Sequence, residues 1–266
     1  MTRRRLDAEL VRRGLARSRE HAGELIGAGR VRVGGQTAGK AATQVETGAA
    51  IVVDTAAEGP AYVSRGGHKL AGALQAFSDL DPRGRRCLDA GASTGGFTDV
   101  LLRAGAAHVV AVDVGYGQIA WSLRTDDRVT VVERLNLREL TPAHVGPEPP
   151  SLAVADLSFI SLRLVLGPIH GCMTPDADYV MMVKPQFEVG KHRVGAGGVV
   201  KDPALRADAV RGVAEHALTL GLGVQGVTAS PLPGPSGNVE YFLWLRAGAP
   251  PLVEADLVKA IEEGPQ

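Results

Sequence analysis

Hydrophobic residues near the start of the chain recur at helical spacing in two short segments. One apolar stripe runs through residues 6–11 and stops before Gly14, which predicts a first helix. A second stripe runs through residues 22–26, where Ser18 is a good N-cap and Gly29 is placed to end the helix. The first 30 residues therefore predict a pair of short helices.

The hydrophobic period then changes from helical spacing to two. Arginine alternates with valine over residues 30–33, Gly34 and Gly35 suit the tight turn of a hairpin, and residues 51–53 are expected to form a closing strand. These elements predict a small α+β domain over residues 1–58. The alanine, glycine and proline of residues 54–60 mark a boundary, and we expect a linker at residues 59–64.

From residue 65 to residue 266, apolar runs of strand length alternate with helical stretches. The expected strands are 86–89, 109–113, 129–132, 152–156 and 179–184, followed by segments near 224–229 and 239–245. Such alternation is typical of a parallel sheet with helices on both faces, and the last two segments would pair as an antiparallel edge. The prediction is an α/β fold with a seven-stranded, mostly parallel sheet.

The segment before the last two strands contains a glycine-rich loop and a helix. Residues 187–202 could form a mobile lid or an irregular loop, and the sequence leaves both open. Asp202 and Pro203 then suit the N-cap and first position of a long amphipathic helix. Its inward side chains are expected to be Leu205, Ala209, Val213 and Leu218.

Composition and charge narrow the class of protein. Hydrophobic residues make up 45% of the chain, which is enough for a packed core, and Cys87 and Cys172 are too few for a disulfide framework or a zinc site. No apolar run is long enough to span a membrane, and no hydrophobic signal core follows Met1. We therefore expect a cytoplasmic protein without a metal ion and without a membrane partner.

The net charge of zero conceals a basic start. Residues 1–40 carry ten Lys and Arg against four Asp and Glu, so the remainder has an equal negative excess. Clustered arginine favours a phosphate-bearing partner, although single arginines often only solvate a helical face. The pattern of residues 5–7, 14–19 and 25–33 resembles the RNA-binding domain named after ribosomal small-subunit protein four. The candidates for RNA contact are Arg3, Arg4, Arg17, Arg19 and Lys40, together with Arg65 just beyond the linker.

A glycine-rich turn follows the first expected strand of the larger domain. Asp89 ends that strand, and glycines after it let the backbone approach a bound nucleoside. Asp113 ends the next strand, where a carboxylate can accept both hydrogen bonds of a ribose diol. This pattern resembles the class I, Rossmann-like S-adenosylmethionine methyltransferases. The candidate cofactor residues are Asp89, Gly91, Ser93, Gly95 and Asp113, with Asn136 near the adenine; an isolated loop Asn is more often a turn residue.

Four charged residues occur where strand ends and an adjoining helix meet the expected crevice. They are Lys69, Asp156, Lys184 and Glu240, and their order resembles the Lys-Asp-Lys-Glu tetrad of the FtsJ-like ribose 2′-O-methyltransferases. The resemblance implies that Lys184, kept uncharged by burial and by the nearby Lys69, takes a proton from a ribose hydroxyl. Asp156 and Glu240 would then orient the amines and the hydroxyl. Which lysine is the base is carried over from the family.

Motifs along the whole chain are similar to those of the TlyA family. They are the segments 62–67, 89–98, 155–161 and 183–188. The resemblance implies 2′-O-methylation of cytidines in 16S or 23S rRNA, or in both, and sensitivity to capreomycin. Two rivals stay open: a base methyltransferase, although residues 156–159 lack its usual motif, and a membrane-active protein, because the family is also called haemolysins. The sequence does not give the oligomeric state.

Overall fold

The computed structural model describes residues 3–27, 29–53, 62–234 and 236–265. The chain divides into two compact units, Met1–Ala61 and Tyr62–Gln266, and each is considered by itself. The boundary predicted at residues 54–60 and the first part of the predicted linker 59–64 lie outside the described residues. Tyr62 is buried in the core of the second unit, and the Val63 N–H donates to the Asp99 carboxylate there.

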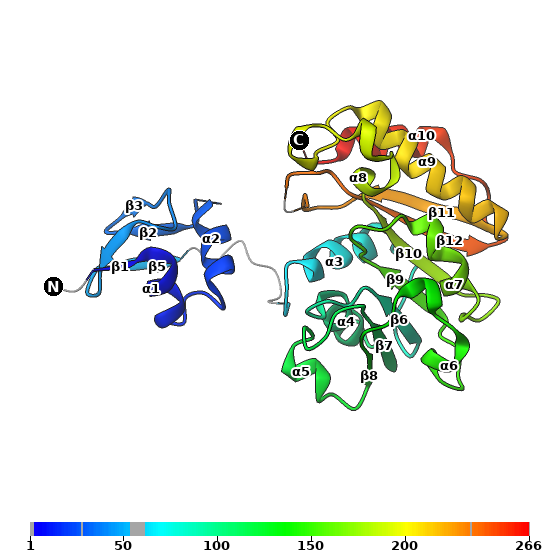
Figure 1. The fold of residues 1–266 in the computed structure, drawn as a ribbon, viewed down its shortest axis with the longest axis horizontal. Coiled ribbons are helices and arrows are strands. Elements are labelled where there is room, and N and C mark those ends of the chain that lie inside the picture. The colour runs from blue at the N-terminus through cyan, green and yellow to red at the C-terminus, as the bar shows by residue number, and fades with distance from the viewer. Residues whose placement is uncertain (1–2, 28, 54–61, 235, 266) are drawn as a thin grey trace. The chain divides into compact units, whose positions relative to one another are not determined.

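The amino-terminal unit is a small α+β domain (Figure 1). Its elements are β1 (Arg3–Arg5), α1 (Leu6–Arg12), α2 (Arg19–Gly27), β2 (Val31–Val33), β3 (Gln36–Thr37), β4 (Gln44–Glu46) and β5 (Ile51–Val53). Strands β3, β2 and β5 form one antiparallel sheet, and β1 pairs with β4. The predicted helices, hairpin and closing strand are confirmed. The β1–β4 pair was not predicted, because three consecutive arginines show no apolar alternation.

Local chemistry explains two of these boundaries. The Ser18 hydroxyl accepts a hydrogen bond from the His21 N–H at 3.1 Å, as an N-cap of α2 should. Gly34 and Gly35 have φ of 56° and 83°, which matches the hairpin turn that needs two left-handed residues.

The second unit is a three-layer α/β domain (Figure 1). Its strands are β6 (Arg86–Ala90), β7 (His108–Val112), β8 (Val129–Val132), β9 (Leu152–Ala155), β10 (Asp178–Val183), β11 (Leu222–Ala229) and β12 (Tyr241–Ala247). Its helices are α3 (Gly66–Ala76), α4 (Gly96–Arg103), α5 (Trp121–Arg124), α6 (Pro142–Val145), α7 (Leu166–His170), α8 (Pro185–Glu188), α9 (Pro203–Thr219) and α10 (Glu254–Glu263).

The seven strands are ordered β11-β12-β10-β9-β6-β7-β8 in one sheet. Strands β10, β9, β6, β7 and β8 are parallel, whereas β12 runs antiparallel to both of its neighbours. All seven predicted strands and the antiparallel edge are confirmed. Helices α3, α4 and α5 contribute to the core on one face, and α7, α9 and α10 to the core on the other.

Helix α9 begins as predicted, since the Asp202 carboxylate accepts from the Ala204 N–H at 2.9 Å and Pro203 follows. Its buried face includes Ala209 and Val213, but the inward position predicted for Leu218 is wrong: this side chain is 39% exposed. Ala217 takes the buried position one turn after Val213 because it continues the spacing of four residues, which Leu218 does not. The preceding loop contains two short 3-10 turns, Lys191–Arg193 and Ala196–Gly198.

Candidate active site

The four residues predicted to form a catalytic tetrad are brought together in two ion pairs. Lys69 Nζ lies 2.5 Å from a Glu240 carboxylate oxygen, and Lys184 Nζ lies 2.6 Å from a carboxylate oxygen of Asp156. Lys69, Lys184 and Glu240 are buried, and Asp156 is half-buried. Burial of paired charges of this kind requires close and specific contacts, which these distances provide.

Sheet topology explains why residues so distant in sequence meet. Asp156 and Lys184 directly follow β9 and β10, so both lie at the carboxyl edge of the parallel strands. Glu240 directly precedes β12, and the antiparallel register that pairs Val183 with Tyr241 places Glu240 opposite Lys184. Helix α3 supplies Lys69 from the neighbouring layer. The two ion pairs therefore adjoin at one end of the sheet.

The electrostatic environment of Lys184 differs from the one expected. The charge of Lys69 was expected to act on Lys184, but Glu240 balances that charge, and Asp156 stands beside Lys184 itself. Each amine therefore has its own carboxylate partner. Asp156 is thus positioned to stabilise the ammonium that would form when Lys184 takes a proton.

Two features of the cluster were not identified from sequence. The Lys184 amine also donates to the Ser158 hydroxyl at 3.1 Å, so Asp156 and Ser158 hold it from two sides. The second Glu240 oxygen is buried and has no hydrogen-bond partner among the residues that the structure describes. Ser158 could have been found as the polar residue two positions beyond a strand-end carboxylate, but the acceptor on Glu240 depends on packing.

The glycine turn after β6 is built as a close approach of three segments. Gly91 has φ of 88°, and a Cβ there would lie 2.8 Å from the Asp156 carbonyl oxygen. Gly95 has φ of 94°, and its Cβ would lie 2.3 Å from the Leu123 side chain. Only glycine satisfies both the backbone angle and the space at these positions. The turn therefore packs the end of β6 against the backbone of Asp156, one of the two carboxylate residues of the tetrad.

Asp89 is fully buried at the base of this turn. One carboxylate oxygen accepts from the Thr98 hydroxyl at 2.6 Å, while the other has no partner in the described part of the chain. Burial raises the pKa of Asp89 to about 7, although the Thr98 hydrogen bond opposes the rise. A buried acceptor without a partner is rare in proteins, so it indicates a site where a polar ligand group or a water completes the set.

Asp113 and Ser93 connect the ends of β6 and β7. The Asp113 carboxylate accepts from the Ser93 N–H at 2.8 Å and from the Gly115 N–H at 2.6 Å, one bond to each oxygen. Each oxygen keeps a further lone pair, so two hydroxyls of a ribose can still be accepted. Ser93 itself has φ of 48°, a left-handed value, because the turn is tight here.

Asn136 has a turn role in this structure. Its side-chain oxygen accepts from the Arg138 N–H at 3.1 Å and caps the 3-10 helix Leu137–Glu139. The amide nitrogen is a donor that this cap does not use. Contact with an adenine ring stays a prediction.

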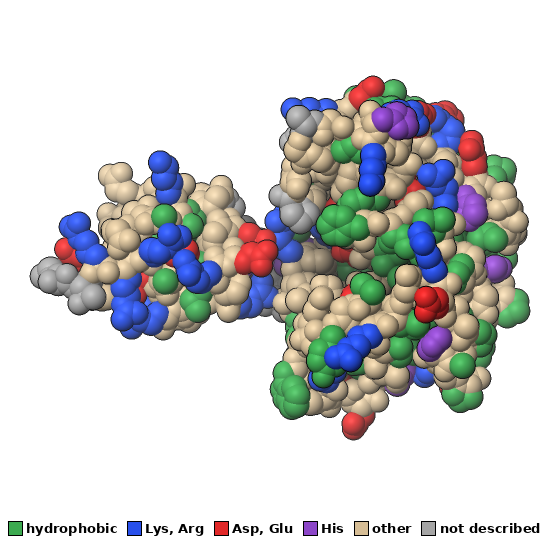
Figure 2. Space-filling view, in the orientation of Figure 1, with side chains coloured by type: hydrophobic (Ala, Val, Ile, Leu, Met, Phe, Trp, Pro, Cys, Tyr) green, Lys and Arg blue, Asp and Glu red, His purple; other side chains and the backbone are tan. Residues whose placement is uncertain are grey.

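The predicted RNA-binding side chains of the amino-terminal unit are all exposed. Arg3, Arg4, Arg17, Arg19 and Lys40 are at the surface, and Figure 2 shows several basic side chains gathered on the visible face of this unit. Arg19 also pairs with the Asp7 carboxylate at 3.0 Å, as does Arg5 at 2.9 Å.

Arg65, at the start of the second unit, is exposed as well, and its guanidinium approaches the Pro233 carbonyl at 3.4 Å.

An exposed aromatic side chain lies near the tetrad. Phe159 is 91% exposed, has φ of 66°, and packs against the Phe187 ring with a centroid distance of 5.3 Å. Phe159 and Phe187 follow Asp156 and Lys184 by three residues each. An exposed ring of this kind can stack on a nucleobase.

The described residues contain no group of three or more His, Cys, Asp and Glu side chains placed to hold a metal ion, and Cys87 and Cys172 are buried free thiols. No helix within the described ranges has both the length and the apolar character needed to cross a membrane.

Known proteins match both units. Residues 62–247 match the family of FtsJ-like methyltransferases, and residues 4–51 match the S4 domain. The chain is 62% identical over 268 residues to the 16S/23S rRNA (cytidine-2′-O)-methyltransferase TlyA of Mycobacterium tuberculosis, covering 99% of each. It belongs to the TlyA family of FtsJ-like methyltransferases.

Two more relatives show the range of names within this family. The 23S rRNA (cytidine-2′-O)-methyltransferase TlyA of Campylobacter jejuni is 35% identical, over 69% of this chain and 70% of its own. A solved structure from Streptococcus thermophilus, described as a candidate hemolysin, has a TM-score of 0.79 and 36% identity, covering 99% of this chain and 96% of that one. The TlyA family therefore carries both an rRNA-modifying name and a haemolysin name.

Proposed function

We propose that this chain transfers the methyl group of S-adenosylmethionine to the ribose 2′-hydroxyl of cytidines in 16S and 23S rRNA. The observation that carries the proposal is the pair of Lys–carboxylate contacts at the carboxyl edge of the sheet, beside a glycine turn suited to a nucleoside. A ribose hydroxyl is a poor nucleophile until its proton is removed, and this cluster offers amines and carboxylates for that task. The relative from M. tuberculosis, which is similar over the whole chain, supports both rRNAs as substrates.

In this mechanism Lys184, with its amine in the uncharged form, takes the hydroxyl proton and becomes an ammonium. Asp156 and Ser158 hold its amine, and the Asp156 carboxylate stabilises the ammonium that results, as a buried carboxylate does for the histidine of a catalytic triad. Lys69 and Glu240 form the second wall of the site, and the free Glu240 oxygen is an acceptor that can orient the ribose hydroxyl. Proton removal and orientation are thus divided between the two ion pairs.

The residues of the glycine turn fit S-adenosylmethionine. Asp113 would accept the ribose diol, the turn Gly91–Gly95 would let the backbone approach the nucleoside, and the free oxygen of buried Asp89 marks an acceptor within the turn. When bound, the cofactor supplies an activated methyl group. We assign Asn136 to the adenine side of this site, through the amide nitrogen that its cap leaves unused.

We further propose that the exposed arginines of the amino-terminal unit hold the rRNA backbone, while Arg65 contacts RNA next to the methyltransferase domain. Phosphate contacts position a substrate without reading its sequence, so the choice of nucleotide depends on the crevice. An enzyme acting on ribosomal RNA works in the cytoplasm, which is where we place this protein. Loss of its activity is expected to lower sensitivity to capreomycin.

The deciding experiment maps ribose methylation by mass spectrometry in 16S and 23S rRNA incubated with purified protein and S-adenosylmethionine. We expect Lys184→Ala to lower the transfer rate by more than about a hundredfold, the typical contribution of general-base catalysis, with cofactor affinity nearly unchanged. Lys201→Ala is the matched control, because that lysine is exposed and outside the cluster. Retained transfer in the Lys184 variant would remove the base assignment, and a methyl group on a base would remove the ribose assignment.

A further inference from the structure

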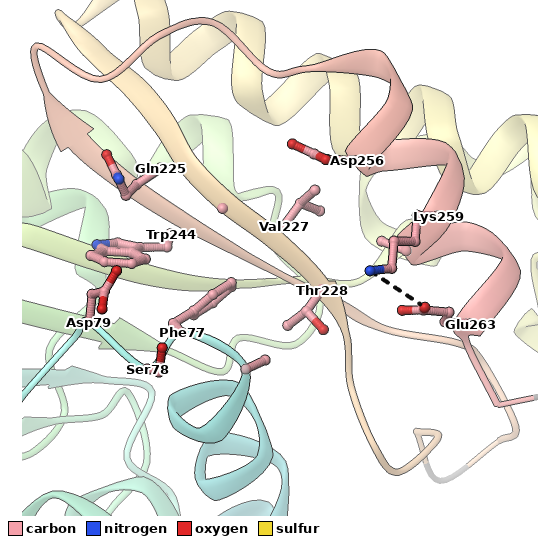
Figure 3. Close-up of a pocket in the computed structure, with 13 residues that line it drawn as sticks. Phe77, Ser78, Asp79, Gln225, Val227, Thr228, Trp244, Asp256, Lys259 and Glu263 are labelled. Atoms are coloured by element: carbon pink, nitrogen blue, oxygen red, sulfur yellow. Dashed lines mark ion pairs between the residues drawn. The ribbon is translucent and has the colours of Figure 1, made fainter.

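A cavity lies at the edge of the sheet, lined by residues other than those of the tetrad (Figure 3). Its volume is about 390 Å³, within the range of ligand sites. Strand β11 contributes residues 225–228, the last residue of α3 and the turn after it contribute residues 76–79, and α10 contributes the opposite wall. The tetrad residues do not line it.

The lining of this cavity contains two aromatic rings and three carboxylates. Phe77 and Trp244 are almost fully buried and pack together with ring centroids 5.6 Å apart. Asp79 stands on the α3 side, and Asp256 and Glu263 stand on the α10 side, as Figure 3 shows. Among the described residues that line this cavity, Lys259 is the one cation, and it lies 3.9 Å from Glu263. The excess of carboxylates favours a cationic partner and disfavours nucleic acid.

The main chain of β11 can also form hydrogen bonds at this site beyond those within the sheet. β11 is the edge strand of the sheet, and its only ladder partner within the described residues is β12. Pro250 accepts from the Val224 N–H at 2.7 Å, where a β-bulge begins, so the edge is covered there. Beyond the bulge, residues 226–229 can offer alternate N–H and C=O groups to an added strand.

We propose that this groove binds an extended, arginine- or lysine-bearing segment of a partner protein as an additional strand along β11. Side chains of an added strand point alternately to the two faces of the sheet. Basic side chains on one face would meet Asp256 and Glu263, and those on the other would lie over Phe77 and Trp244 and meet Asp79. Guanidinium groups combine well with both aromatic rings and carboxylates. The groove would thus dock the enzyme on a protein while its crevice works on RNA.

Trp244 provides a direct reporter of occupancy. The chain has two tryptophans, and the other, Trp121, is 76% exposed, so Trp121→Phe leaves Trp244 as the sole tryptophan emitter. The probe is an end-capped peptide Thr-Arg-Arg-Thr-Arg-Arg-Thr, which places arginine on both faces of an added strand. It is titrated into the full-length variant while Trp244 emission is followed. A peptide with glutamate in place of arginine controls for charge, and one with proline in place of threonine keeps the charge but removes the N–H donors.

We expect saturable binding of the Thr-Arg peptide, no binding of the glutamate peptide, and about tenfold weaker binding of the proline peptide. The combined changes Asp79→Asn, Asp256→Asn and Glu263→Gln should weaken binding by about tenfold or more, as expected when charge-assisted contacts are lost. Glu262→Gln, the same change one residue away and outside the groove, should have no effect. Lys259→Ala should tighten binding, because it frees Glu263.

Three results would overturn the proposal. Equal binding of the threonine and proline peptides would reduce the effect to general charge attraction. Undiminished binding by the triple variant would place the peptide elsewhere. A dimer in sedimentation that excludes the peptide, and that the triple variant loses, would make a second copy of this chain the occupant.

Discussion

Asp89 shows how one buried carboxyl links pH to stability. Its folded-state pKa of about 7 lies above the ordinary value of 3.8 because burial disfavours the charged form. The folded state therefore binds more protons than the unfolded state between these two values, and the contribution of Asp89 to stability falls as pH rises through that window. Above about pH 7 the unfavourable contribution is constant.

Asp89→Asn removes this titration while keeping the shape of the side chain. Relative to the parent protein, we expect the thermal midpoint of the variant to increase steadily between about pH 4 and pH 7 and then to level off. Thermal unfolding of both proteins without cofactor, in a series of buffers, measures the difference. A difference in midpoint that does not depend on pH would show that Asp89 is charged throughout.

At the scale of elements, the glycine turn between β6 and α4 links the proposed cofactor site to the tetrad. Gly91→Ala must fit a Cβ 2.8 Å from the Asp156 carbonyl and 2.6 Å from the Leu157 side chain, so the segment carrying Asp156 has to move. We expect a loss of stability of about 2 kcal/mol or more and a marked fall in methyl transfer.

Gly84→Ala is the matched control for Gly91→Ala. Gly84 has φ of 71°, but a Cβ there meets nothing within 4 Å, so it carries the cost of the backbone angle alone. That cost is about 1 kcal/mol, and transfer should be retained. Denaturant unfolding and transfer assays on both variants separate the two effects. Equal losses in both would show that close packing at Gly91 is unimportant.

The strands of the second unit and the end of the first helix could be predicted from local sequence. The apolar runs of β6, β7, β9 and β10 are almost entirely buried on both faces, so composition alone reveals them. The β1–β4 pair depends on tertiary contacts, which no local pattern contains. The burial of Ala217 in place of Leu218 instead follows the four-residue spacing from Ala209 and Val213. The tetrad could be proposed because strand ends meet at one edge, but the pairing of each lysine with a particular acid required the register of β12.

On the scale of the whole molecule, the excess of positive charge lies in residues 1–40 of the amino-terminal unit. Arg4 is exposed on β1, whereas Arg13 donates to the carbonyls of Thr47 and Ala49 and pairs with Glu9 at 2.8 Å. Arginines of the same cluster thus have different roles. The first is available to a phosphate, and the second connects α1 to the segment before β5.

Arg4→Ala should therefore weaken rRNA binding, and the slope of log affinity against log salt should fall by about one, with stability unchanged. Arg13→Ala should instead destabilise the amino-terminal unit by about 1 kcal/mol through the lost hydrogen bonds. Filter binding over a range of KCl concentrations and thermal unfolding give the two readouts. The reverse pattern would contradict the assignment of these side chains.

The late position of β12 in the sequence has a consequence for synthesis of the protein on the ribosome. Lys69, the glycine turn, Asp156 and Lys184 are all synthesised before residue 200, but Glu240 and the strand that fixes it emerge almost last. A nascent chain halted before this strand would hold most of the ligand crevice, yet Lys69 would have no acidic counterpart. The Lys69–Glu240 ion pair can therefore form only late in translation.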